Sequence, residues 1–221
     1  MLGRGGQRHA ALGGGSVSLA LAAAAGCTTW FVVEYLWHEE VHLYTYDLFR
    51  ERVGFKLVWG CLCFYPFFYA LPLTFLVRAR ADVSPAAAAA CVALFAAGWA
   101  LTRGANLQKY AAKRGAREFA FLGVRVPMAT VPGSGGRLLA SGFWALSRHV
   151  NYLGETVQAA AVAAPAWLAT GSALPFLYPL YYVALFVPRQ IDDDAICAAK
   201  YGAAWAEYKR RVPWRVIPFV Y

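Results

Sequence analysis

The chain has 221 residues, of which 60% are hydrophobic and 16% aromatic, while only 15% carry a charge. Its mean hydropathy is +0.43. This balance excludes an ordinary soluble domain and indicates a protein of the lipid bilayer. The net charge of +9 is concentrated in two stretches. We attribute these stretches to membrane topology and to contact with membrane lipid, and we expect no nucleic acid as a partner.

The first 15 residues are rich in glycine and are expected to form a flexible N-terminal segment. An apolar run follows at 16–37. Basic residues precede it, as they do in a secretory signal peptide. The apolar character continues through Trp30 and Val33, beyond any plausible cleavage site. We therefore interpret this run as a membrane helix, and residues 16–221 as one transmembrane domain.

Five apolar runs approach the roughly 20 residues that a helix needs to cross about 30 Å of hydrocarbon. They lie near 16–37, 55–77, 85–102, 153–170 and 174–187. None shows the alternating period of a barrel strand facing lipid. The sequence predicts an all-α, polytopic integral membrane protein with about five transmembrane helices and shorter amphipathic helices near the C-terminus.

Residues 38–42 read HEEVH and match H-E-x-x-H, the helical signature of zinc proteases. A catalytic zinc needs a third protein ligand. His9 lies in the flexible segment, and Asp192, Asp193 and Asp194 qualify by chemistry only. We therefore predict no metal site and interpret HEEVH as the interfacial end of a membrane helix, where polar and aromatic residues gather.

Basic residues define the expected topology. Between 103 and 137 a single acid, Glu118, is outnumbered by seven cations, and the C-terminal tail holds five more. The positive-inside tendency places both stretches in the cytosol. Two helices between them make this topology self-consistent, although Arg78 and Arg80 then fall on the far side. The basic residues are Arg103, Lys109, Lys113, Arg114, Arg117, Arg125, Arg137, Lys200, Lys209, Arg210, Arg211 and Arg215.

The stretch SRHVNYLGE, at 147–155, places six polar or amphipathic groups directly before a membrane run. A surface loop could hold them without cost, but beside apolar segments they suggest a polar ligand at the edge of the bilayer. In the later helix, Arg189, Asp193, Cys197 and Tyr201 follow at intervals of four and share a face. Arg189 and Asp193 can pair there. On spacing alone, we favour a salt-bridged helix end over a binding site for these residues.

Four motifs together resemble one family. They are FVVEYLWHEEVHLYTYDL, NLQK, LLASGFWALSRHVNYLGE and the C-terminal LPFLYPLYYVALFVPRQIDDDAICAAKYGAAWAEYKRRVPWRVIPFVY. In this order they resemble the sterol reductases of the C14 reductase, 7-dehydrocholesterol reductase and lamin B receptor type, from about Thr28 to the last residue. The resemblance implies a helical protein of the endoplasmic reticulum that reduces a sterol double bond with NADPH, without a nucleotide-binding fold. In that family Asn-Glu-Asp usually takes the place of His38-Glu39-Glu40.

The resemblance also implies the cofactor site, in the part from about 103 to 221. The family has an arginine four residues after the lysine of NLQK, and its role falls here on either Lys113 or Arg114. Asp192 stands where the family has a cation, and this loss of positive charge predicts weaker NADPH binding. The remaining contacts implied are Lys109, Leu139, Trp144, Asn151, Tyr152, Asp193, Cys197, Ala198, Ala199, Lys200, Tyr201 and Tyr208.

The expected reaction begins with protonation of the sterol alkene, because an isolated alkene does not accept hydride directly. Arg189 and Asp193 are expected to organise the nicotinamide end and the proton supply, with Tyr152 as a relay. Tyr44 and Tyr182 are alternative relays, and Glu39 and Glu155 are alternative acids. We favour the C14=C15 bond and place a 7-dehydrocholesterol-type C7 reductase second.

Other functions stay open at this point. An isoprenylcysteine or phospholipid methyltransferase using S-adenosylmethionine has a related Arg-His-Pro motif, whereas Val150 stands where that proline would be. Family members are about twice as long, and this chain matches their C-terminal half, so a truncated non-catalytic membrane protein is a further alternative. The sequence leaves the oligomeric state undetermined.

Overall fold

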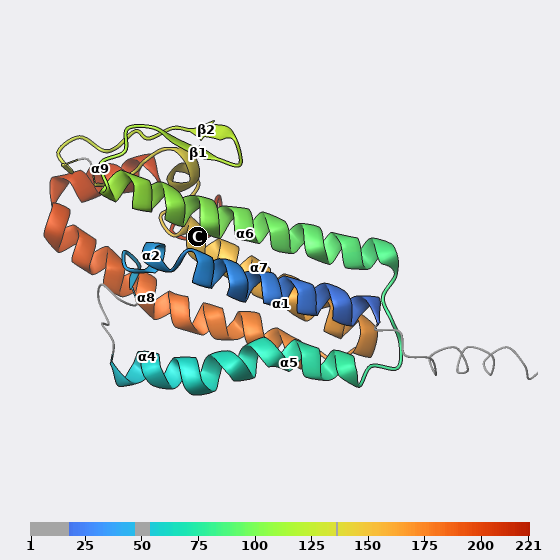
Figure 1. The fold of residues 1–221 in the computed structure, drawn as a ribbon. Coiled ribbons are helices and arrows are strands. Elements are labelled where there is room, and N and C mark those ends of the chain that lie inside the picture. Colours follow the sequence, from blue (N-terminus) through green and yellow to red (C-terminus); the bar gives the residue numbers. More distant parts are fainter. Residues whose placement is uncertain (1–17, 47–53, 136) are drawn as a thin grey trace, which may run out of the picture.

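A computed structural model describes residues 18–46, 54–135 and 137–221 (Figure 1). The expected flexible segment 1–15 lies outside these residues. The described chain is predominantly helical, as predicted. The helices are α1 (Leu19–Trp37), α2 (Glu39–His42), α4 (Phe55–Trp59), a π-helical turn (Gly60–Phe64), α5 (Tyr65–Val77), α6 (Pro85–Lys113), α7 (Val150–Thr170), α8 (Leu177–Tyr201) and α9 (Ala203–Arg211).

Side chains define where the first long helix, α1, begins. The Ser18 hydroxyl accepts a hydrogen bond from the Leu21 N–H at 3.1 Å, and the Asp82 carboxylate accepts from the Leu19 and Ala20 N–H groups at 2.6 and 2.9 Å. Asp82 belongs to the connection between α5 and α6, so it fixes that connection against the start of α1. These contacts satisfy backbone donors that have no partner within the helix.

Helices α1, α5, α6, α7 and α8 run side by side, and α7 contacts the other four (Figure 1). Glycine permits the closest of these contacts. A Cβ on Gly154 of α7 would lie 2.6 Å from the Gly98 carbonyl oxygen and 2.3 Å from the Thr102 hydroxyl, both in α6. Only a residue without a side chain allows the two backbones to approach so closely.

Three helical segments are long and apolar enough to cross a membrane: Leu19–Trp37, Gly60–Val77 and Pro85–Lys113. The predicted number of five is therefore not confirmed. Helices α7 and α8 contain 21 and 25 residues and lie alongside the other three. Their composition is more polar, because α7 carries Glu155 and Gln158 and the second half of α8 carries Arg189 and three aspartates.

A short antiparallel hairpin, which we did not predict, follows α6 (Figure 1). It pairs β1 (Phe119–Phe121) with β2 (Val124–Val126) through a two-residue turn at Leu122 and Gly123. Both turn residues have positive φ, 50° and 79°, which is the geometry of the tightest hairpin turns. The hairpin occupies part of the basic stretch 103–137, outside the helical bundle.

Candidate functional site

One cavity of about 670 Å³ extends through the bundle. Its inner part is lined by apolar and aromatic side chains of α1, α5 and α8, among them Phe31, Tyr69 and Leu185. Its outer part is lined by cations of α6 and α8, among them Lys109 and Lys200. The cavity therefore joins a space suited to an apolar molecule to a space suited to an anion.

Most of the expected site residues line this cavity, although they come from separate segments of the chain. They are Lys109, Lys113, Leu139, Trp144, Asn151, Tyr152, Arg189, Asp193, Cys197, Lys200, Tyr201 and Tyr208. Arg114, Ala198 and Ala199 are not among the lining residues. The Arg114 guanidinium lies 5.4 Å from the centre of the Tyr110 ring and donates to the Tyr110 hydroxyl at 3.2 Å. Of the two alternatives at this position, the structure brings Lys113 to the cavity.

The outer part of the cavity combines cations with aromatic rings. Lys109 Nζ lies 5.6 Å from the centre of the Trp144 ring, and Lys113 Nζ lies 5.4 Å from that of Tyr44. The Trp144 indole N–H donates to the Ala105 carbonyl at 2.9 Å, which fixes the ring. Such a set can bind phosphate groups through the lysines and a flat base through the rings.

Asp193 lies beyond the apolar part of α8. Burial raises the pKa of this carboxyl, while Lys109 and Lys113 act in the opposite direction. The expected pairing of Arg189 with Asp193 is not the arrangement found. The Arg189 guanidinium lies 4.9 Å from the centre of the Tyr46 ring and 5.9 Å from that of Phe186. The Asp193 carboxyl therefore keeps its proton to a higher pH than an exposed aspartic acid does.

Four rings form a column along the cavity. The centroids of His149 and Tyr152 are 5.0 Å apart, those of Tyr152 and Phe186 4.3 Å, and those of Phe186 and Tyr182 5.3 Å. The planes are within 9° of parallel. Burial lowers the pKa of His149 to about 3, and Lys109, Arg148 and Arg215 add to the effect. His149 is therefore a neutral ring at physiological pH.

The alternative relays and acids are distributed unevenly. Tyr44, Tyr182 and Glu155 line the cavity together with Tyr152. The Tyr182 hydroxyl is 3.1 Å from that of Tyr69, so the two form a hydrogen-bonded pair. Glu39 lies instead at a separate surface pocket near Trp37. Of the two glutamates considered as acids, Glu155 therefore lines the cavity and Glu39 does not.

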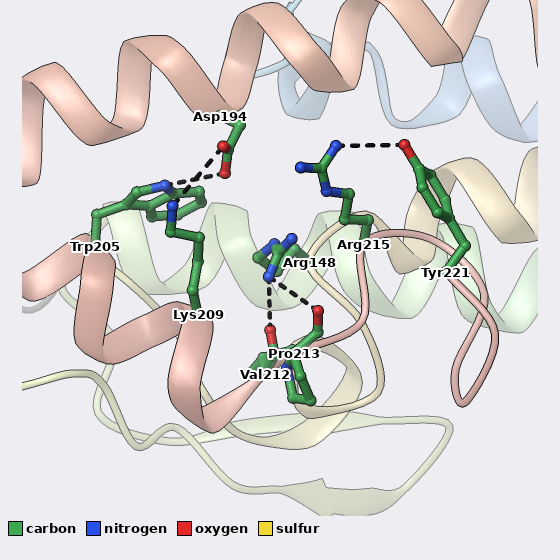
Figure 2. Close-up of polar contacts among 8 residues, drawn as sticks. All are labelled: Arg148, Asp194, Trp205, Lys209, Val212, Pro213, Arg215 and Tyr221. Atoms are coloured by element: carbon green, nitrogen blue, oxygen red, sulfur yellow. Dashed lines mark hydrogen bonds and ion pairs between the residues drawn. The ribbon is translucent and has the colours of Figure 1, made fainter.

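Polar contacts tie the C-terminal segment and α9 to Arg148 and to α8 (Figure 2). Arg148 Nη1 donates to the carbonyl oxygens of Val212 and Pro213, each at 3.1 Å. The Trp205 indole N–H donates to the Asp194 carboxylate at 3.1 Å, which ties α9 to α8. Arg148 therefore positions the tail and the start of α7, a role that the sequence motif alone did not indicate.

Sequence reasoning missed a buried ion pair that also lines the cavity. Arg103 of α6 donates through Nε to Glu34 Oε2 of α1 at 2.6 Å, and their side chains are only 2% and 9% exposed. The sequence carried a signal for Arg103 although not for its partner, because Arg103, Asn106, Lys109 and Lys113 recur at intervals of three and four along an apolar helix. Ionisable groups at such positions mark functional sites by default.

The HEEVH segment is not one continuous helix. His38 ends α1 with φ of −107° and ψ of 32°, and α2 begins at the next residue. His42 stacks on Tyr35 at 3.7 Å, and Glu40 accepts a hydrogen bond from Tyr110 at 2.8 Å. Within the described ranges no group of three His, Cys, Asp or Glu side chains could hold a metal ion. The facing histidines that H-E-x-x-H requires are not formed.

The fold and the cavity thus define a helical membrane protein with a cavity that cationic, apolar and aromatic side chains line together. The chain belongs to the ergosterol biosynthesis ERG4/ERG24 family, whose model matches residues 9–221. The resemblance seen in the sequence motifs is therefore confirmed.

Three curated relatives illustrate the similarity. The delta(14)-sterol reductase of Methylotuvimicrobium alcaliphilum is 37% identical over 207 residues, which are 94% of this chain and 48% of the relative. The delta(14)-sterol reductase TM7SF2 of Mus musculus is 40% identical over 209 residues, again 94% and 48%. The delta(14)-sterol reductase LBR of Gallus gallus is 37% identical over 186 residues, which are 83% of this chain and 28% of the relative. The chain thus spans about half the length, or less, of these relatives.

Proposed function

We propose that the chain carries the catalytic half of a membrane-bound reductase that reduces the C14=C15 double bond of a sterol with NADPH. The observation that carries the proposal is the cavity of about 670 Å³. It is lined by most of the residues that the family resemblance assigned to NADPH, together with apolar and aromatic side chains. Relatives named delta(14)-sterol reductase support the choice of bond.

The chemistry of the lining fits the dinucleotide. Lys109, Lys113 and Lys200 supply cations for phosphate oxygens, and the indole of Trp144 beside Lys109 supplies a face for a flat ring. The flanking Tyr201 and Tyr208 add aromatic surface. NADPH bound here would supply the hydride. The residues of the chain would orient it, exclude water and deliver a proton.

Proton delivery is assigned to the polar groups around the ring column. The raised pKa of Asp193 keeps a proton at this carboxyl over a wider pH range than in water. Tyr152, 7% exposed and stacked between His149 and Phe186, is the relay in this proposal. Arg189 holds positive charge beside this path. A proton delivered to the sterol alkene leaves a tertiary carbocation on the sterol, which the hydride then neutralises.

Localisation and topology follow as part of the proposal. We infer a multi-pass protein of the endoplasmic reticulum with five spans, in which α7 and α8 join the three apolar segments. The ends of α6 and α8 and the C-terminal tail would face the cytosol, because the lysines and arginines gather there. A cytosolic mouth gives NADPH access to the lysines while the sterol stays within the bilayer.

The test is turnover by the purified chain in detergent with NADPH. C14-unsaturated and C7-unsaturated sterols are supplied separately, and the reduced products are detected by mass spectrometry. Reduction of the C14-unsaturated sterol is expected. Reduction of the C7-unsaturated sterol alone would reassign the bond. Reduction of neither by a folded sample that binds NADPH would mean that the other half of the longer relatives is needed for catalysis.

A further inference from the structure

The Glu34–Arg103 pair carries an inference beyond the proposed reaction. Glu34 Oε2 lies 2.6 Å from Arg103 Nε and 2.5 Å from Nη2, so the carboxylate engages one edge of the guanidinium. The second terminal nitrogen, Nη1, has no hydrogen-bond partner among the residues that the structure describes. Arg103 as a whole is 2% exposed and lines the cavity.

A buried guanidinium N–H without a partner is costly, because the group has lost its contacts with water. Here it borders a cavity that a ligand can enter, so the acceptor is expected on the ligand. Glu34 already balances the charge of Arg103. The arrangement therefore favours a neutral oxygen acceptor over a second anion.

The position along α6 narrows the choice of ligand. Arg103 precedes Lys109 by six residues, which corresponds to about 9 Å along a helix axis. If Lys109 binds the phosphates, Arg103 lies about 9 Å from them along the helix, toward the apolar N-terminal part of α6. A nicotinamide ring joined to the phosphates through its ribose could span that separation.

A complementary group lies on α7. Asn151 Oδ1 is buried and has no partner among the described residues. The Thr102 hydroxyl donates to the Asn151 carbonyl at 3.1 Å, so the residue beside Arg103 contacts this turn of α7. The two unpaired atoms, a donor on α6 and an acceptor on α7, match the carbonyl oxygen and the NH₂ group of a primary carboxamide.

We propose that Arg103, positioned by Glu34, binds the carboxamide oxygen of the nicotinamide and so sets the angle at which the ring faces the sterol. The inference rests on the proposed use of NADPH. It makes Arg103 a determinant of ring orientation and Glu34 a positioning residue, because the glutamate acts only through the arginine. A hydroxyl group on the sterol is the competing acceptor for Arg103, and the experiment below distinguishes it from the carboxamide oxygen.

The experiment compares the binding of two ligands in the purified chain by calorimetry. NADPH carries the carboxamide, and 2′-phospho-ADP-ribose has the phosphates and the adenine but lacks the nicotinamide. Arg103→Lys keeps the charge beside Glu34 and removes Nη1. We expect the Kd of NADPH to rise about tenfold while that of 2′-phospho-ADP-ribose stays unchanged.

Two further variants keep the result interpretable if Arg103→Lys folds poorly. The double variant Glu34→Gln/Arg103→Gln removes both charges together, so neither is left buried alone, and it is expected to show the same selective loss. Arg148→Lys is the matched control. Its guanidinium is also buried but donates to the Val212 and Pro213 carbonyls, so the ratio of the two Kd values is expected to stay at the wild-type level.

Equal losses for both ligands would overturn the assignment and leave Arg103 with a structural role. NADPH binding that is unchanged in Arg103→Lys would also overturn the assignment. A folded wild-type chain that binds 2′-phospho-ADP-ribose and NADPH equally well would show that the carboxamide makes no contact. Failure of the wild type to bind either nucleotide would instead defeat the proposed function, and the inference with it.

Discussion

Lys113 and Arg114 are adjacent in the sequence, yet their charges lie in different places. Lys113 Nζ is 5.4 Å from the centre of the Tyr44 ring and lines the cavity. The Arg114 guanidinium is 5.4 Å from the centre of the Tyr110 ring, at the surface. One residue of helix turns the side chain by about 100°, and of these two residues Lys113 lines the cavity and Arg114 does not.

The pair provides a matched test of the phosphate end. Lys113→Met is expected to raise the Kd of NADPH roughly fivefold, because a cation near the phosphates is lost at the mouth of the cavity. Arg114→Met removes the same charge one position later and is expected to leave the Kd within twofold of wild type. Calorimetric titration with NADPH at low and high salt measures both. Similar losses in the two variants would mean that general surface charge, not position, determines binding.

Asp193 offers a second matched pair, with Asp194. Asp193→Asn is expected to reduce sterol turnover at least about 100-fold, the usual contribution of a positioned acid or base. Asp194→Asn is the control, because Asp194 does not line the cavity and its Oδ1, which accepts from the Trp205 indole N–H, remains in asparagine. Full activity of Asp193→Asn would remove Asp193 from the mechanism and leave Glu155 to be tested next.

The same substitution has a predictable effect on stability. Burial raises the pKa of Asp193 in the folded chain, so the folded state binds this proton more tightly than the unfolded state does. The contribution is favourable below the unfolded pKa and is lost as the pH rises through the folded pKa. Asp193→Asn is therefore expected to unfold at the same temperature as wild type, or a higher one, at pH 7. A lower unfolding temperature would mean that ionised Asp193 stabilises the fold.

The sequence was sufficient for the helical class and for most of the expected site residues that line the cavity, for different reasons. Long apolar runs indicate membrane helices directly, whereas residues such as Lys109, Trp144 and Tyr208 were found through the family resemblance. Composition could not show whether α7 crosses a membrane as the apolar helices do, because a helix surrounded by others can carry Glu155 and Gln158 without exposing them to lipid.

Other features depended on contacts between segments that are distant in the sequence. Glu34 and Arg103 are 69 positions apart, and nothing in either local motif indicates the other. The hairpin at 119–126 was not predicted from the sequence, because its turn is Leu-Gly and not the usual Asn-Gly. The i,i+4 spacing of Arg189 and Asp193 predicted a pair, but the cations that lower the pKa of Asp193 are Lys109 and Lys113 of α6.

The buried His149 is expected to lower the stability of the folded chain at acid pH. Its pKa is about 3 in the folded chain, against 6.5 ordinarily, so the unfolded state takes up the proton first as the pH falls. Stability is expected to fall below pH 6.5, by at most about 1.4 kcal/mol for each pH unit. His149→Phe retains a ring to stack on Tyr152 and removes the titration. Unfolding temperatures measured from pH 4 to 7 should therefore depend less on pH in this variant, and an unchanged dependence would locate the acid sensitivity elsewhere.

The close contact of α6 with α7 gives a prediction that is independent of the ligand. An added Cβ at Gly154 would lie 2.6 Å from the Gly98 carbonyl oxygen and 2.7 Å from the Thr102 backbone nitrogen, and neither backbone atom can rotate away. Gly154→Ala is therefore expected to destabilise the chain by about 1–3 kcal/mol. Gly26→Ala is the control, because a Cβ at Gly26 of α1 meets nothing within 4 Å, and alanine there should stabilise the helix by about 0.5–1 kcal/mol. Thermal unfolding in detergent would show opposite shifts for the two variants. A neutral Gly154→Ala would mean that α6 and α7 can move apart at little cost, and that the cavity between them is less rigid than this contact implies.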